Sequence, residues 1–122
     1  MAIQHKSSLV SFHGPVGKSD WNEFTLSAFD QVLIEGNETE FFIPEEEEDS
    51  FTINSGSATG KLLGGNLSVL TAMIGSEYLP SFEGSILFLE DVGEDVYRVD
   101  RMLTQLKLSG ILDQINGFVF FQ

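Results

Sequence analysis

Four carboxylates follow directly on an apolar run in the stretch ILFLEDVGED. Ile86–Leu89 is uninterrupted by polar residues, and Glu90, Asp91, Glu94 and Asp95 come after it. In open α/β sheets, functional side chains gather just outside the carboxyl ends of the strands. A carboxylate at that position can be half buried and still reach a crevice. Glu90 is therefore the first candidate for chemistry in this sequence.

Two other interpretations of these carboxylates remain open. All four precede a predicted helix, and negative charge near a helix N-terminus is favoured by about 0.3–1 kcal/mol per group. They could also hold Mg²⁺ or Ca²⁺, because hard cations prefer clustered oxygen ligands, although their spacing matches no established loop. The residue pattern by itself favours the helix-terminus role over catalysis.

A strand, a helix and a second strand are expected to position this acidic segment. Ser85–Leu89 is the strongest strand prediction, because a continuously apolar run is typical of a strand covered on both faces. Gly117–Phe121 is a second such strand. Between them, Val96–Leu108 predicts an amphipathic helix, which Gly110 ends. The order predicts a right-handed βαβ unit. The apolar face of the helix comprises Val96, Val99, Leu103 and Leu106, with Met102 beside it.

A glycine-rich turn is expected before this unit. Ser57–Leu63 favours an extended segment that reaches Gly64 and Gly65, whose missing side chains permit unusual backbone geometry. Asn66 can cap a short helix that begins at Leu67 and ends before Gly75. Such a turn can cradle phosphate. However, no Lys-Ser or Lys-Thr pair follows the glycines, so the phosphate-loop pattern is absent and nucleotide binding is disfavoured.

The first half of the chain predicts a strand, a helix and a hairpin. Ser8–Phe12 reads as a strand that enters a turn at His13-Gly14-Pro15. Trp21–Ile34 has the spacing of a surface helix with one buried face, with Ser19 or Asp20 as N-cap and Gly36 as stop. Two short strands are expected at Glu40–Pro44 and Phe51–Ile53. The acidic run between them, Glu45–Asp49, is predicted to be a solvated hairpin loop, with cation binding as the alternative.

Composition restricts the class of protein. The 122 residues are 42% hydrophobic, which is enough for one domain with a buried core. The formal net charge of −13 and the six Lys and Arg residues disfavour nucleic acid as a partner. No apolar run reaches the length of about 20 residues that a membrane helix needs. Cysteine is absent, which fits a reducing compartment. We expect a cytoplasmic protein without membrane contact.

The sequence also resembles a known family, the LD-carboxypeptidases, over nearly its whole length. These are serine peptidases that include muramoyl-tetrapeptide carboxypeptidases and microcin-immunity peptidases. The resemblance rests on five stretches of the chain. They are Leu9–Pro15, Gly64–Leu67, Gly75 with Tyr78 and Pro80, Gly84 before Ile86–Asp91, and Tyr97–Leu103.

This resemblance implies a fold and a catalytic role. Residues 1–122 would form a single, partial C-terminal domain of the swivelling β/β/α kind, an α/β fold with a mixed sheet and flanking helices. The family's active site lies between this domain and an N-terminal α/β domain, and uses a Ser-Glu-His triad. Mapped by motif, the triad Glu falls on Glu90, which would orient the imidazole and stabilise its charged form.

The other two triad members have no counterpart here. The family's nucleophile lies in a Gly-x-Ser-Asp turn, which does not occur in the sequence, and neither His5 nor His13 matches the family's Gly-His motif. The resemblance therefore implies a piece of a larger enzyme that is inactive alone. The complete enzyme would cleave an L,D peptide bond in murein tetrapeptides, or a peptide-nucleotide toxin, without metal or cofactor.

A non-enzymatic alternative remains open. The chain could be a stand-alone module that binds peptide or protein without catalysis. Family members often dimerise, and a domain parted from its neighbour can expose apolar surface and self-associate. Phe118, Phe120 and Phe121 are the expected contributors to such a surface.

Overall fold

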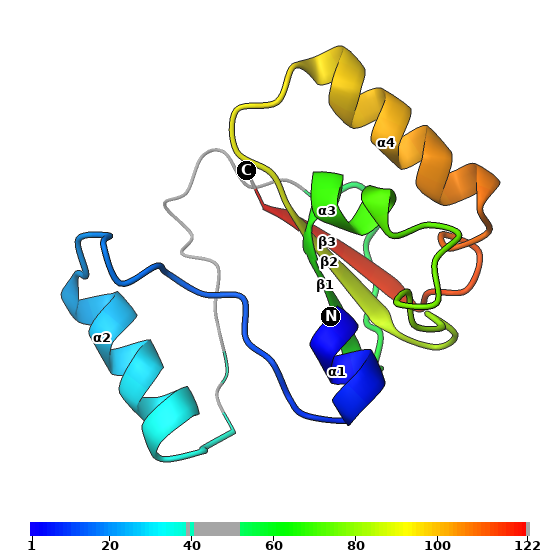
Figure 1. Ribbon diagram of the computed structural model, residues 1–122. Coiled ribbons are helices and arrows are strands. Elements are labelled where there is room, and N and C mark those ends of the chain that lie inside the picture. The colour runs from blue at the N-terminus through cyan, green and yellow to red at the C-terminus, as the bar shows by residue number, and fades with distance from the viewer. Residues whose placement is uncertain (39, 41–51, 122) are drawn as a thin grey trace. The chain divides into compact units, whose positions relative to one another are not determined.

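The computed structural model describes residues 1–38, 40 and 52–121, and the chain divides into two compact units. The first unit consists of Met1–Phe12 and Gly56–Gln122, and the second of His13–Ser55. Figure 1 shows the elements in chain order. All candidate site residues after position 56 belong to the first unit.

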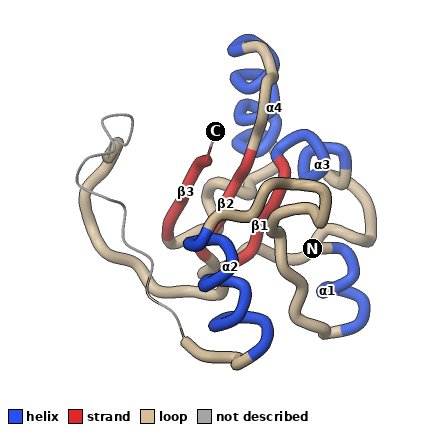
Figure 2. The backbone as a smooth tube through the Cα atoms, turned by 90° about the vertical axis from the view of Figure 1, so that its left-hand side faces the viewer, coloured by secondary structure: helices blue, strands red, loops and turns tan. Residues whose placement is uncertain are grey.

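The first unit contains a parallel three-stranded sheet. Its strands are β1 (Leu62–Asn66), β2 (Ile86–Glu90) and β3 (Gly117–Phe121), in the order β1-β2-β3. Figure 2 shows them side by side with β2 in the middle. Both pairings are parallel, which confirms the βαβ arrangement of β2, helix and β3 and the α/β fold class. The antiparallel part of the expected mixed sheet does not occur among the described residues.

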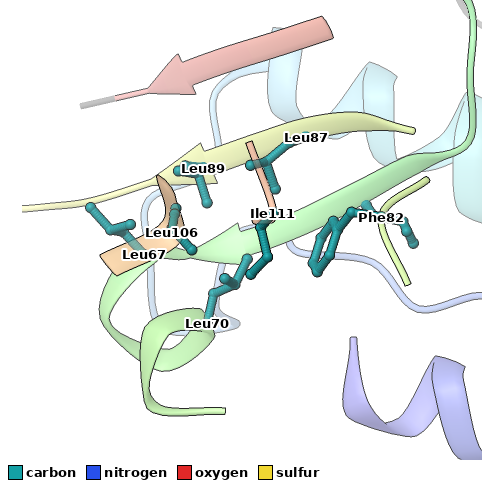
Figure 3. Packing of buried hydrophobic residues seen from close by; sticks show 8 residues of the cluster. Leu67, Leu70, Phe82, Leu87, Leu89, Leu106 and Ile111 are labelled. Carbon is teal, nitrogen blue, oxygen red and sulfur yellow. The ribbon is translucent and has the colours of Figure 1, made fainter. Parts of the chain in front are cut away.

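Helices α3 (Leu67–Ala72) and α4 (Val96–Leu108) flank this sheet. Alternation along β2 directs Leu87 and Leu89 to one face, where both are completely buried. Figure 3 shows these side chains with those of α3 and α4 around them. The opposite face of β2 is half buried, so the prediction of full cover on both faces was wrong. The buried apolar core comprises Leu63, Leu67, Leu70, Phe82, Leu87, Leu89, Leu106 and Ile111.

Helix α4 has the predicted bounds, but one of its predicted core residues is exposed. Leu106 is completely buried, and Val99, Met102 and Leu103 pack against the core at partial exposure. Val96, by contrast, is 86% exposed. The helix begins beyond the carboxyl end of β2, where the sheet no longer covers its first turn (Figure 2). Gly110 follows the helix with a φ of 78°, as its expected role of helix stop requires.

The two glycines before α3 lie within a strand rather than in a turn. The predicted segment Ser57–Leu63 overlaps β1 only at its end, and the strand continues through Gly64 and Gly65 to Asn66. A Cβ atom on Gly64 would lie 1.7 Å from the carbonyl oxygen of Phe88. Glycine is therefore needed here because two neighbouring backbones approach closely, as glycine in a strand often indicates.

The beginning of the chain is helical, which the sequence did not predict. Helix α1 (Ala2–Ser7) is joined to a later loop by an ion pair of 2.7 Å between Lys6 Nζ and Glu77 Oε2. The predicted strand Ser8–Phe12 was wrong, since these residues are exposed and form no strand. A β-leaning segment needs a partner for its backbone N–H and C=O groups, and no described strand pairs with this one.

The second unit contains the predicted helix in two parts. Helix α2 (Glu23–Phe29) continues into a π-helical turn, η1 (Asp30–Ile34). The N-cap is Asn22 rather than Ser19 or Asp20, and its Oδ1 accepts a hydrogen bond of 2.8 Å from Thr25 N. No residue of either part is fully buried, so the expected buried face is only half covered.

The expected hairpin of the second unit lies mostly outside the described residues. Of its predicted strands, Glu40–Pro44 is described only at Glu40 and Phe51–Ile53 only at its last two residues, and none of these three residues is in a strand. The acidic loop Glu45–Asp49 lies wholly outside. Within the described parts of the chain, no helix is long and apolar enough to cross a membrane.

Candidate functional site

Glu90 is the last residue of β2 and is half buried. In the register of the sheet it lies opposite Asn66 of β1 and Phe121 of β3. Because side chains alternate along a strand, Glu90 points away from the face that buries Leu87 and Leu89. The structure thus places the predicted carboxylate at the carboxyl edge of the central strand.

Asn66 holds this carboxylate. Its side-chain Nδ2 donates a hydrogen bond of 3.1 Å to Glu90 Oε2. Its Oδ1 accepts hydrogen bonds from Val69 N at 3.2 Å and from Ser68 Oγ at 2.8 Å. The predicted N-cap role of Asn66 is confirmed. Because Oδ1 is engaged by these donors, the amide can only present its NH₂ group to Glu90.

The sequence did not predict the contact between Asn66 and Glu90. The signal that could have indicated it is the polar residue at the end of each of two neighbouring strands. The register that brings these two particular residues together is a property of the folded sheet.

The remaining carboxylates of the acidic segment have separate environments. Asp91 is only 2% exposed, and its backbone N–H donates to the carbonyl oxygen of Phe121 at 3.1 Å. Glu94 and Asp95 both form ion pairs with Arg98. Glu94 Oε2 lies 3.2 Å from Arg98 Nη1, and Asp95 Oδ2 lies 3.8 Å from Arg98 Nε. The four carboxylates therefore do not act as one cluster. In the described parts of the chain, no three His, Asp or Glu residues are grouped so as to hold a metal ion.

Arg98 is the basic residue that pairs with Glu94 and Asp95. Its Nε donates to the Tyr97 hydroxyl at 3.1 Å, and its Nη1 donates to Glu94 Oε2. Both hydrogen bonds raise the pKa of Arg98 above its ordinary value, and the bond to Tyr97 has the larger effect. Asp95 is the N-cap residue of α4, yet its side chain makes no capping hydrogen bond. The helix-terminus interpretation thus fits Glu94 and Asp95 by position, whereas Glu90 is engaged by a neighbouring strand.

Among the described residues, two cavities of the first unit bear on the candidate residues. One, of about 210 Å³, is lined by Asp91, Glu94, Val96, Val99 and Phe120. The other, of about 250 Å³, is lined by residues that include His5, Lys61 and Leu63. Leu63 is near the start of β1, whereas Glu90 ends the parallel strand β2, so His5 is remote from Glu90 along the sheet. His13 is exposed in the second unit.

These features define an α/β protein with a carboxylate site at the carboxyl edge of a parallel sheet. The particular family follows from comparison with known proteins, because residues 59–122 match the LD-carboxypeptidase C-terminal domain. The chain belongs to the LD-carboxypeptidase family.

Individual relatives agree with this assignment. A "Probable murein peptide carboxypeptidase" of Bacillus subtilis (strain 168) is 38% identical over 123 residues, covering 97% of this chain and 38% of the relative. The crystal structure of muramoyltetrapeptide carboxypeptidase from Oxalobacter formigenes is 34% identical, with a TM-score of 0.69 over 89% of this chain and 38% of that one.

A more distant structure shares the fold. The microcin C7 self-immunity protein MccF, solved in complex with aspartyl sulfamoyl adenosine, superposes with a TM-score of 0.73 at 22% identity. The match covers 99% of this chain and 45% of that one. The chain thus spans 38–45% of the length of these three relatives.

Proposed function

We propose that this chain supplies the glutamate of a Ser-Glu-His triad, as part of a serine-type LD-carboxypeptidase, and that Glu90 is that glutamate. The observation that carries the proposal is the position of Glu90, half buried at the end of β2 with Oε2 held by Asn66. A triad carboxylate needs a fixed orientation more than it needs exposure, because it must hold one tautomer of a histidine.

Glu90 would act on the histidine rather than on the substrate. As the serine hydroxyl attacks the scissile carbonyl, the imidazole takes the hydroxyl proton and becomes positively charged. A carboxylate hydrogen-bonded to the imidazole stabilises that charge and keeps the ring in place. The bond from Asn66 restrains the rotation of the Glu90 carboxylate, which reduces the freedom lost when the imidazole binds.

The serine and the histidine would come from parts of the enzyme outside these 122 residues. Residues 1–122 would then be a partial C-terminal domain, with the active site completed by a separate N-terminal domain. The 122-residue chain alone is expected to be inactive, because a triad without its nucleophile and base retains little catalysis.

The substrate we propose is a murein tetrapeptide, cleaved at an L,D peptide bond near its free carboxyl terminus. The names of the relatives from B. subtilis and O. formigenes support a murein peptide. The complex of MccF with aspartyl sulfamoyl adenosine supports a peptide-nucleotide as the second candidate. We propose a cytoplasmic site of action, which the absence of cysteine in the sequence favours.

The test begins with the DNA that encodes this chain, read past both ends to obtain the open reading frame. The longest encoded protein is then assayed for release of D-alanine from a murein tetrapeptide. Glu90→Gln should lower kcat about 10³–10⁴-fold, the loss expected when a triad carboxylate is neutralised. Glu83→Gln, a change of the same kind at an exposed loop residue, should leave the rate unchanged.

Two results would contradict the proposal. One is an active enzyme in which Glu90→Gln retains normal kcat. The other is a frame without Gly-x-Ser-Asp and Gly-His motifs, together with peptide binding but no hydrolysis. The second result would favour the alternative of a non-catalytic binding module.

A further inference from the structure

We propose that Ser68 is a positioning residue for the Glu90 carboxylate and acts on it through the side-chain amide of Asn66. The proposal deepens the proposed function and rests on it for the role of Glu90 in catalysis. The three side chains form a continuous row of hydrogen bonds. Ser68 Oγ donates to Asn66 Oδ1 at 2.8 Å, and Asn66 Nδ2 donates to Glu90 Oε2 at 3.1 Å. Ser68 thus acts at one remove from the carboxylate.

The hydroxyl of Ser68 restrains the orientation of the Asn66 amide. Asn66 Oδ1 accepts one hydrogen bond from Ser68 Oγ at 2.8 Å and another from the Val69 backbone N–H at 3.2 Å. The bond from Ser68 is the shorter of the two, so we expect it to be the stronger restraint on rotation of the amide. An amide that cannot rotate keeps its NH₂ group directed at Glu90.

The bond that Asn66 accepts from Ser68 also strengthens the bond that it donates to Glu90. Hydrogen bonds in series polarise one another, so a carbonyl group that accepts a donor makes the attached NH₂ group a better donor. The final acceptor is a carboxylate, and bonds to ionised groups are roughly twice as strong as bonds between neutral groups. All three residues are half buried, which limits competition from water. Loss of the Ser68 hydroxyl should therefore weaken the hold on the carboxylate.

Helix α3 keeps Ser68 in a fixed place. Leu67 and Leu70 of this helix are buried in the core (Figure 3). The buried hydroxyl of Thr71 donates to the carbonyl oxygens of Leu67 and Ser68, at 3.0 Å each. The first turn of α3 is thus bound both to the core and to itself. Ser68 presents its hydroxyl from a rigid element, as a group that positions a catalytic side chain must.

A contribution to helix stability alone is the alternative role of Ser68, and the chain offers a control for it. Ser76 lies beyond the other end of α3, and its hydroxyl donates to the carbonyl oxygen of Met73 at 2.7 Å. Ser76→Ala therefore removes a local hydrogen bond near the same helix without affecting Asn66. Ser68→Thr is the conservative variant, because threonine retains the hydroxyl donor.

The first test is NMR spectroscopy of the 122-residue chain labelled with ¹⁵N and ¹³C, which needs no catalysis. The signal to follow is the Asn66 side-chain amide proton that bonds to Glu90, identified by the shift that Glu90→Ala causes. Ser68→Ala should move this resonance toward its position in Glu90→Ala, because the bond to the carboxylate weakens. Ser68→Thr and Ser76→Ala should leave it at the wild-type position.

The second test measures kcat and KM of the longest encoded protein for release of D-alanine. Ser68→Ala should lower kcat about tenfold with KM unchanged, the effect of one hydrogen bond that matters mainly in the transition state. Ser68→Thr should have the kcat of the wild type. Ser76→Ala should also have it, because its hydroxyl lies outside the row of hydrogen bonds.

Three results would overturn the inference. An unmoved Asn66 resonance in Ser68→Ala would do so, as would an unchanged kcat of Ser68→Ala in an enzyme that Glu90→Gln inactivates, and both would leave the proposed function intact. An equal fall in kcat for Ser68→Ala and Ser76→Ala would reduce Ser68 to a residue that stabilises the helix. Normal kcat in Glu90→Gln would instead overturn the inference and the proposed function together.

Discussion

Asn66 and Glu90 end two neighbouring parallel strands, lie opposite each other in the register, and are joined by a hydrogen bond of 3.1 Å. The same Asn66 side chain caps α3 through its Oδ1. One amide group thus connects the start of a helix to the carboxylate at the edge of the sheet. Its two functions can be separated by substitution, because they use different atoms.

Asn66→Ser and Asn66→Asp should differ in stability even though both residues are good N-caps. Serine keeps the cap and loses the donor to Glu90, at a cost of about 1.5–3 kcal/mol for a hydrogen bond to a charged group. Aspartate keeps the cap and places a second carboxylate against Glu90, which should destabilise the protein further, since like charges directly opposite on paired strands repel. Urea unfolding at pH 7 measures the free energy of unfolding of both variants. Equal stability of the two variants would show that the Asn66 amide does not restrain Glu90.

Gly64→Ala should prevent close pairing of β1 with β2. The new Cβ atom would lie 1.7 Å from the Phe88 carbonyl oxygen, and a backbone atom cannot move aside cheaply. We expect a loss of about 3 kcal/mol or more, at the upper end of overpacking costs. Gly56→Ala is the matched control, because nothing lies within 4 Å of its added Cβ. Thermal unfolding followed by circular dichroism measures both. A Gly64→Ala variant as stable as Gly56→Ala would contradict the observed strand spacing.

The contribution of Arg98 to stability should not change between pH 6 and pH 10. Its pKa is raised in the folded chain by Tyr97 and Glu94, so its stabilising effect is present below the unfolded pKa and is lost only as pH rises through the folded one. Arginine in the unfolded chain also stays protonated throughout this pH range. The difference in unfolding free energy between wild type and Arg98→Met should therefore be flat over this range and shrink with added salt. A marked fall between pH 8 and pH 10 would mean that another group titrates with it.

The isolated chain should self-associate through β3. Phe121 is 56% exposed, Phe118 and Val119 are also exposed, and β3 pairs only with β2 among the described strands. Unpaired strand edges and open apolar patches both favour association. Light scattering should show concentration-dependent oligomers that Phe121→Lys reduces. Leu108→Lys, the same added charge at an exposed position of α4, should not reduce them. A stable monomer across concentrations would rule out this surface.

Several elements could be predicted from the sequence because their signals are local. Continuous apolar runs predicted β2 and β3, and the spacing of apolar residues predicted α4 with the observed bounds. Asn66 was predicted as the cap of α3, because its side chain can reach the first free N–H groups of the helix. The position of Glu90 at the end of β2 followed from the same local signal.

Only the tertiary structure decided what depends on neighbours distant in the sequence. Gly64 and Gly65 were predicted to form a turn, but the need for glycine at Gly64 comes from the carbonyl group of Phe88 on another strand. Ser8–Phe12 has the composition of a strand but no partner to pair with among the described strands. The bond from Asn66 to Glu90 and the burial of Asp91 both depend on strand register and packing. Composition and local spacing thus determined which elements form, while register and close approach determined which side chains meet, because those are relations between segments.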